Sequence, residues 1–265
     1  MTERLDRTTR RQILKEDQPF IGKVLDVGGD LRGVKANTRH LALMLMDTKM
    51  KYRASRAAAF ASQLLDSTMN KKVTAPAACS KGCYYCCKTY VSVTIPEILR
   101  LAKSVRGKSE KVARVTKAAA DSSAVPQAQR EIDRVVCPIL EDKVCSEYEP
   151  RPLVCRAVLS SSLPTCLRIF EENTGEPFPF LEDTTDIRVS VVVMMQAALI
   201  LSGLPHVHFE MNQALAVALQ HEDAEECWLK GEPIFADVPM DAADLRPSGL
   251  SAMMHSLVDH IRPTL

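Results

Sequence analysis

The chain has 265 residues, enough for one large domain or two small ones. Its hydrophobic share of 46% and charged share of 25% are ordinary for a globular protein, so disorder, collagen and coiled coil are excluded for the chain as a whole. The formal net charge of +1 gives no overall field that would attract nucleic acid or an anionic membrane. The aromatic share of 5% argues against a surface that stacks bases or sugars.

The first part of the chain is predicted to hold a polar arm and then a long helix. Residues 1–35 form the arm, in which Gly28, Gly29 and Gly33 mark a turn or loop. Residues 38–70 are predicted to form one helix, because apolar side chains recur at helical spacing and no Gly or Pro interrupts them. The methionines of this helix are interpreted as core residues rather than metal ligands.

Shorter elements are expected in the middle of the chain. Residues 71–78 form a loop, and residues 90–93 alternate like a short strand. Thr94, Pro96 and Glu97 have the spacing of a capping box with proline in the first turn, so a helix is expected to start there. That helix is expected to end near residue 106, and further helices are expected at residues 109–121 and, after Pro126, up to about residue 136.

The C-terminal half is predicted to be helical as well. Its longest apolar run, residues 189–201, is shorter than the about 20 residues of a membrane-spanning helix, so it is interpreted as a core segment of a soluble protein. Residues 186–201 favour a helix, and further helices are expected near residues 205–230 and 250–262. The predicted fold class is mainly α, a helical domain around a cysteine-ligated, proline-rich irregular core at residues 137–166.

Three regions are expected along the chain. Residues 1–70 hold the N-terminal arm and the long helix, residues 71–166 form a cysteine-cluster metal-binding domain, and residues 167–265 form a C-terminal helical region packed on it. The first residues interleave arginines with acids and lack an apolar stretch, so no signal peptide is expected and the protein is predicted to be cytoplasmic.

The nine cysteines are the unusual feature of the composition, and most of them are clustered. Disulfide-stapled chains are usually secreted, whereas closely spaced thiols in a reducing compartment more often hold a metal. The sequence therefore predicts a cysteine-ligated metal centre. The candidate ligands are Cys79, Cys83, Cys86, Cys87, Cys137, Cys145 and Cys155, while Cys166 and Cys227 stand apart.

The first cysteine group can bring three thiolates together on one tight turn, from Cys79, Cys83 and Cys86. Gly82 permits the positive φ that lets the backbone curl around an ion. Lys81 and Lys88 add positive charge and are expected to lower the thiol pKa values. Because neighbouring side chains diverge, we expect either Cys86 or Cys87 to point to a second metal or into the core.

The second cysteine group is expected to complete the site. A four-thiolate centre needs at least one ligand from Cys137, Cys145 or Cys155 if the first turn supplies three. Such a metal would clamp two distant segments and add folding free energy. Arg151 and Arg156 lie beside these cysteines in the sequence and are expected to compensate cluster charge or to donate hydrogen bonds to sulfur.

The combined motifs resemble the CxxCxxCC zinc- or iron-chelating family (YkgJ-like). The motifs are Cys86-Cys87, Cys137-Pro-Ile-Leu, Cys145-Ser-Glu-Tyr148 and Arg151-Pro-Leu-Val-Cys155-Arg156. The resemblance covers residues 79–156 and implies that the seven candidate cysteines bind metal. One departure is that three residues separate Cys79 from Cys83, where the family name has two. One branch of the family is flagellin lysine N-methylase, so the resemblance also implies methyl transfer to protein lysine.

The spacing of the first three cysteines has a second interpretation. Cys-x3-Cys-x2-Cys with Tyr85 before the last cysteine also resembles the radical S-adenosylmethionine enzymes, in which three thiolates hold a [4Fe-4S] cluster. Such an enzyme needs a partial βα barrel after the motif, whereas helices and prolines are expected here. A [4Fe-4S] cluster without that barrel stays open, as does S-adenosylmethionine as a cofactor.

The identity of the metal is left between zinc and iron, since thiolate ligands suit both. More than four clustered cysteines exceed one zinc site and favour an iron–sulfur cluster or two metals. Redox switching by disulfide exchange is a third interpretation. His206, His208 and Glu210 would form a second metal site only if their segment is extended, because alternate residues of a strand share a face.

Three classes of function follow. The first is a metal-binding protein with an iron–sulfur centre that is structural or carries electrons, and the second is a lysine N-methyltransferase-like enzyme acting on protein. The third is a zinc-structured adaptor whose basic surface binds a protein partner, with nucleic acid as a less favoured partner and no membrane contact. The alternative for that surface is a solvated helix face. Its residues are Arg100, Lys103, Arg106, Lys108, Lys111, Arg114 and Lys117.

Overall fold

The computed structural model describes residues 5–23, 31–244 and 248–265. Within these ranges the chain has thirteen α-helices and strands of only two or three residues, which confirms the mainly α fold class. Gly28 and Gly29 lie outside the described residues. Gly33 does not mark a loop as predicted but lies in a helix, where an added Cβ would come within 2.5 Å of the carbonyl oxygen of Lys23.

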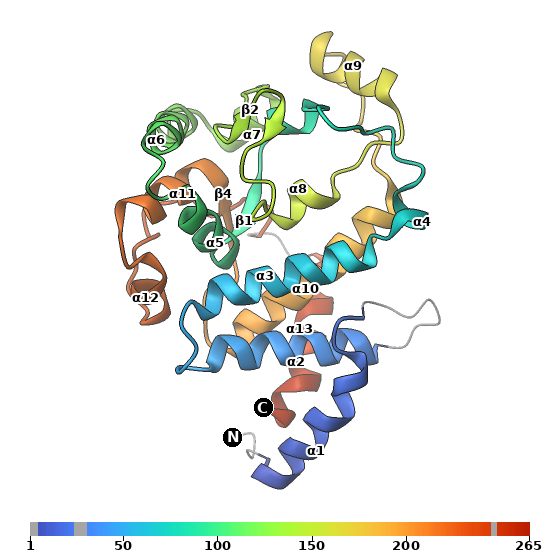
Figure 1. Ribbon diagram of the computed structural model, residues 1–265, viewed down its shortest axis with the longest axis vertical. Helices are drawn as coiled ribbons and strands as arrows, with labels where there is room; N and C mark the ends of the chain where they lie inside the picture. Colours follow the sequence, from blue (N-terminus) through green and yellow to red (C-terminus); the bar gives the residue numbers. More distant parts are fainter. Residues whose placement is uncertain (1–4, 24–30, 245–247) are drawn as a thin grey trace.

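Four helices form the largest part of the core. Helix α10 contacts each of the other three, and Figure 1 shows α2 and α3 running beside it. Their facing side chains, such as Leu41, Leu65 and Met194, are fully buried. The four helices are α2 (Arg32–Met46), α3 (Arg53–Thr68), α10 (Glu182–Leu201) and α13 (Gly249–Ile261).

Helix α10 contains the longest apolar run of the sequence. Among the described residues it is the one helix whose length and composition would allow it to cross a membrane. However, Val191, Met194 and Met195 are buried against neighbouring helices of the same chain. Helix α10 is therefore the central helix of a packed core, which is consistent with a soluble protein.

The long helix predicted for residues 38–70 is wrong, because the chain breaks it into α2 and α3. The carboxylate of Asp47 accepts the backbone N–H of Lys49, and Tyr52 adopts a left-handed conformation at φ 55°. The carboxylate of Glu225 then accepts the N–H groups of Ala54 and Ser55 at the start of α3. Local turn chemistry and this distant cap allow the two helices to fold back on each other.

A second layer is built around a short antiparallel ladder. Strand β1 (Ser92–Thr94) pairs with β4 (His208–Glu210), and each strand leads directly into a helix. The first of these helices is α5 (Ile95–Val105), and its start confirms the capping box of Thr94 and Glu97. The second is α11 (Met211–Gln220), which packs against α5 and against α6 (Ser109–Ser123).

The remaining elements are short, and several connect the cysteine segments. Figure 1 shows β2, α7 and α9 at the end of the molecule opposite α1. Within the described ranges the strands form two two-stranded sheets, so the βα barrel of a radical enzyme is not formed there. The elements are α1 (Arg7–Asp17), η1 (Gln18–Phe20), α4 (Lys71–Thr74), η2 (Tyr85–Lys88), α7 (Gln127–Ile132), β2 (Leu140–Glu141), β3 (Val144–Cys145), α8 (Leu153–Ala157), α9 (Leu163–Glu171), α12 (Ala224–Leu229) and η3 (Arg262–Thr264).

The basic stripe on α5 and α6 contacts groups of the same chain. Lys108 and Lys111 each lie 2.6 Å from the buried carboxylate of Glu147. Arg106 donates to backbone carbonyls at the end of α11, and Lys103 lies 3.4 Å from the centre of a tyrosine ring. Part of the stripe therefore holds α5 and α6 against their neighbours.

Candidate metal centre

The first cysteine turn is held by backbone hydrogen bonds and by aromatic stacking. Gly82 has φ 88°, as its predicted role requires. The ring of Tyr85 stacks between Tyr84, at 5.4 Å, and Phe170 of α9, at 5.8 Å. Lys88 lies over the two tyrosine rings rather than beside a thiol. Aromatic stacking therefore holds the turn against α9 without the help of a metal.

A first group of thiols lies where this turn meets Ser160. The backbone N–H of Ser160 donates to Cys79 Sγ at 3.3 Å, and the Cys166 thiol donates to Ser160 Oγ at 3.1 Å. Burial raises the pKa of Cys79, and the nearby thiols of Cys83, Cys86 and Cys166 raise it further. The predicted lysine effect is thus wrong for Cys79. Cys79, Cys83, Cys86 and Cys166 therefore lie close enough for the charge of one thiolate to raise the pKa of another.

A second group of thiols is assembled by the β2–β3 hairpin and α8. Cys137 N–H donates to the carbonyl of Cys87 at 2.8 Å, which joins the two cysteine segments. The hairpin pairs Leu140 with Cys145 and so returns Cys145 toward Cys137. Burial raises the pKa of Cys137 to about 11. Burial and the thiols of Cys137, Cys86 and Cys145 raise the pKa of Cys155 well above its usual range.

Cys86 and Cys87 connect the two groups. The expectation that these neighbouring side chains diverge is not met, because the two thiols hydrogen bond to each other. That hydrogen bond, together with burial, raises the pKa of Cys86. The Cys86 thiol also raises the pKa of Cys79 in the first group and the pKa of Cys155 in the second. The thiols therefore form a continuous assembly.

The thiols of the assembly lie near one another, but they do not surround a common point where an ion could bind. Within the described ranges, no three Cys, His, Asp or Glu side chains converge closely enough to hold a metal. Cys155 has an exposed side chain, although burial among protein groups raises its pKa. A metal would displace the thiol protons and draw the sulfurs together.

Arg151 places buried hydrogen-bond donors near the thiols. Its Nε and Nη1 atoms are buried and have no hydrogen-bond partner in the described part of the chain. Burial raises the pKa of Cys145, and the positive charge of Arg151 opposes that increase, as it does for Cys86. Buried guanidinium donors without an acceptor are costly, so donors placed near thiols fit a metal–thiolate centre.

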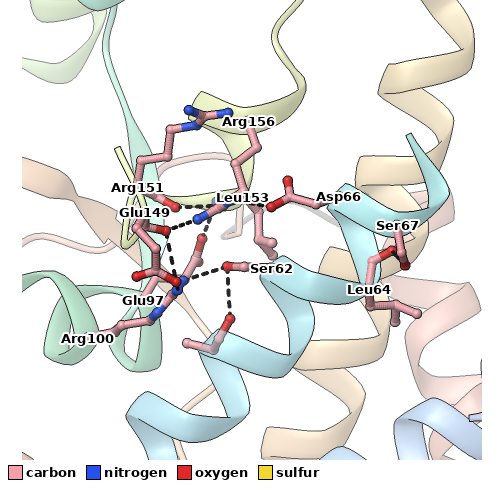
Figure 2. Close-up of polar contacts among 11 residues, drawn as sticks. Ser62, Leu64, Asp66, Ser67, Glu97, Arg100, Glu149, Arg151, Leu153 and Arg156 are labelled. Carbon is pink, nitrogen blue, oxygen red and sulfur yellow. Dashed lines mark hydrogen bonds and ion pairs between the residues drawn. The ribbon is translucent and has the colours of Figure 1, made fainter. Parts of the chain in front are cut away.

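Arg156 does not share this role, which corrects the expectation drawn from its position. Its guanidinium donates to Asp66 at 2.5 Å and to the carbonyls of Arg151 and Glu149 (Figure 2). Arg100 reaches the same loop through Glu149 (Figure 2). Arg156 therefore fastens the loop before α8 to α3.

The other metal candidates do not join this assembly. His208 pairs with Asp244 at 3.0 Å, and Glu210 accepts the N–H of Gln213 at the start of α11. Their segment is extended in β4, but among the described residues they belong to no group able to hold a metal, so this alternative is not formed. Cys227 is hydrogen bonded to Glu232 next to α12.

Cys166 is the residue that the sequence did not single out. It lies in α9, well separated from the closely spaced cysteine motifs, and only the fold brings it to Ser160 and Cys79. Cys166 is buried, and its thiol donates a hydrogen bond to Ser160 Oγ, so only the folded structure could identify it.

Comparison with known proteins agrees with this assembly. Residues 78–177 match the family model "CxxCxxCC: Putative zinc- or iron-chelating domain", which confirms the resemblance drawn from the motifs. The match includes every cysteine of the chain except Cys227. No curated protein and no solved structure matches the chain. Residues 78–177 are therefore similar to that domain, and the match supports metal chelation by their cysteines.

Proposed function

We propose that the protein binds an iron–sulfur centre through the cysteines of residues 78–177. The observation that carries the proposal is the assembly of eight thiols in two connected groups. Cys79, Cys83 and Cys166 lie near Cys86 on one side, and Cys137, Cys145 and Cys155 lie near it on the other, while Cys87 is hydrogen bonded to Cys86. Eight thiols are enough for two four-thiolate centres.

Two features support iron–sulfur over zinc. Cysteine is the only donor type in the assembly, and eight thiols exceed the four of one zinc site. Cluster sulfides would also provide acceptors for the buried N–H groups of Arg151. When bound, the centre would supply a structural clamp and a site for one-electron transfer.

The chain's own residues would prepare this site. The Ser160 N–H already donates to Cys79 Sγ and would stabilise the thiolate form of that ligand. Arg151 would offset the negative charge of the thiolates. Arg156 and Asp66 hold the loop that carries Arg151, so the donor remains in place when the metal leaves.

The test is the metal and acid-labile sulfide content of protein purified without oxygen, with an absorption spectrum. We expect iron, sulfide and a broad band near about 400 nm. Zinc without sulfide or colour would replace the iron–sulfur proposal with a zinc centre. Absence of both metals would contradict the proposal.

Three serine variants test which thiols ligate. Cys83→Ser and Cys166→Ser should each lose metal from the first group, and Cys155→Ser should lose it from the second. Cys227→Ser is the matched control and should keep the full content. Equal loss from all four variants would show that the site has been assigned to the wrong residues.

A further inference from the structure

A cavity of about 690 Å³ lies between α10, α13 and β4, largely outside the CxxCxxCC domain. Its volume is within the range of small-molecule sites. Val189 and Val192 of α10 and Leu250 and Met254 of α13 form apolar walls. The cavity is thus lined mainly by apolar side chains, and a few polar groups in it would fix the orientation of a ligand.

Arg188 supplies the main charge of this cavity. Burial lowers its pKa, and the nearby negative charge of Glu97 opposes that effect. No hydrogen bond or ion pair joins its guanidinium to the described residues. Glu97 is already occupied, because it accepts hydrogen bonds from Thr94 and from Leu153 N–H. Arg188 is therefore a partly buried cation with its hydrogen-bond donors unfilled.

The other acids of the cavity are also occupied. Asp241 accepts from Gln127 Nε2 at 3.0 Å and from Ala243 N–H at 2.9 Å. Asp244 accepts from the backbone N–H and from Nδ1 of His208. The acceptors of the cavity are thus satisfied within the chain.

His208 adds a second donor when its imidazole is protonated, because both ring nitrogens then carry a hydrogen. Its Nδ1 lies 3.0 Å from Asp244, which leaves Nε2 as the remaining ring nitrogen. Burial opposes the charged form of His208, but the hydrogen bond and charge of Asp244 outweigh burial and raise its pKa. His206 and His255 also line the cavity, and burial lowers the pKa of His206.

We propose that this cavity binds a small organic anion, an oxyanion head on an apolar body, with Arg188 as the anchor and His208 as a second donor. The apolar body lies on Val189, Val192 and Met254. Carboxylate and phosphate heads share this chemistry, since both accept two hydrogen bonds from a guanidinium. The proposal stands whether or not the cysteines hold a metal.

The test is isothermal titration of the full chain with decanoate, with decyl phosphate and with the neutral decanamide. We expect decanoate or decyl phosphate to bind one site, and the tighter of the two identifies the head group. Decanamide should bind at least about tenfold more weakly. Equal binding of decanamide, or no binding of either anion up to about 1 mM, would overturn the proposal.

Variants locate the binding site. Arg188→Gln should weaken anion binding about tenfold or more, and Arg188→Lys should weaken it less, because it keeps the positive charge but loses the paired hydrogen bonds of the guanidinium. Arg53→Gln is the matched control, because Arg53 lines a separate apolar cavity of about 890 Å³ beside Trp228. Loss of binding in Arg53→Gln with retention in Arg188→Gln would place the anion in the other cavity and overturn the assignment.

A second variant removes the space itself. Val192→Trp should fill the cavity and abolish binding, while thermal unfolding checks that both this variant and Arg188→Gln are folded. If Arg188→Gln does not fold, the comparison of Arg188→Lys with Val192→Trp decides the question. Undiminished binding in a folded Val192→Trp variant would overturn the proposal.

Discussion

Arg151 has buried N–H groups for which the described residues offer no acceptor, so its contribution to stability depends on what is bound nearby. In the metal-free protein, Arg151→Met removes unsatisfied donors, and the free energy of unfolding should stay the same or rise by up to about 1 kcal/mol. In the loaded protein, the same change should speed metal loss to a chelator. Urea unfolding and chelator kinetics measure the two effects.

Arg134 provides the matched control for this prediction. Its Nε is also buried without a partner among the described residues, and its guanidinium lies over the Phe170 ring at 4.8 Å, as that of Arg151 lies over the Tyr148 ring at 3.4 Å. Arg151 differs in that its positive charge opposes the rise in the pKa values of Cys86 and Cys145. Arg134→Met should leave metal retention closer to that of the unchanged protein. Identical behaviour of the two variants would mean that Arg151 has no special relation to the thiols.

The His208–Asp244 pair predicts a pH dependence of stability. Asp244 raises the pKa of His208 above 6.5, so this stabilisation is complete below about pH 6.5 and is lost as the pH rises through the raised value. Burial raises the pKa of Asp244, but the hydrogen bond and charge of His208 outweigh it and lower the value below 3.8. The stabilisation from Asp244 is therefore present above about pH 3.8 and is lost in stronger acid.

Asp244→Asn should accordingly cost most stability between about pH 4 and pH 6.5. The measurement is the difference in unfolding free energy between the unchanged protein and the variant across this range. A difference that stays constant from pH 4 to pH 9 would show that the pair is not ionic.

At the scale of elements, helix starts show what local sequence can and cannot predict. Thr94 and Glu97 cap α5 from within four residues, so the capping box was visible in the sequence. The start of α3 depends on Glu225, which lies 171 residues from Ala54. A cap supplied from such a distance leaves no pattern in the local sequence. The helix predicted for residues 38–70 therefore continued past Asp47, where the structure has a break.

Glu225→Ala should destabilise the protein by about 2 kcal/mol, because it leaves the N–H groups of Ala54 and Ser55 buried without an acceptor. Thermal unfolding gives the change. The neighbouring exposed Glu226 is the control, and Glu226→Ala should change stability by less than about 0.5 kcal/mol. Equal effects would mean that α3 does not need this distant cap.

At the scale of the whole molecule, the cysteine assembly was largely predictable in content and only partly in arrangement. The clustered spacing of Cys83 and Cys86 predicts metal-binding chemistry, because closely spaced thiols outside secreted proteins more often hold a metal. Cys166 joins them only through the packing of α9 on Tyr85. The opposite roles of Arg151 and Arg156 likewise depend on how the loop before α8 packs, which residue spacing does not encode.

Glu97 links two parts of the molecule that the sequence keeps apart. One carboxylate oxygen holds the start of α5, and the other holds Leu153 at the start of α8, two residues before Cys155. The same carboxylate lines the cavity that contains Arg188. If metal loading displaced α8, Glu97 would carry that displacement to the cavity wall, and occupancy of either site would then change the affinity of the other by the same factor.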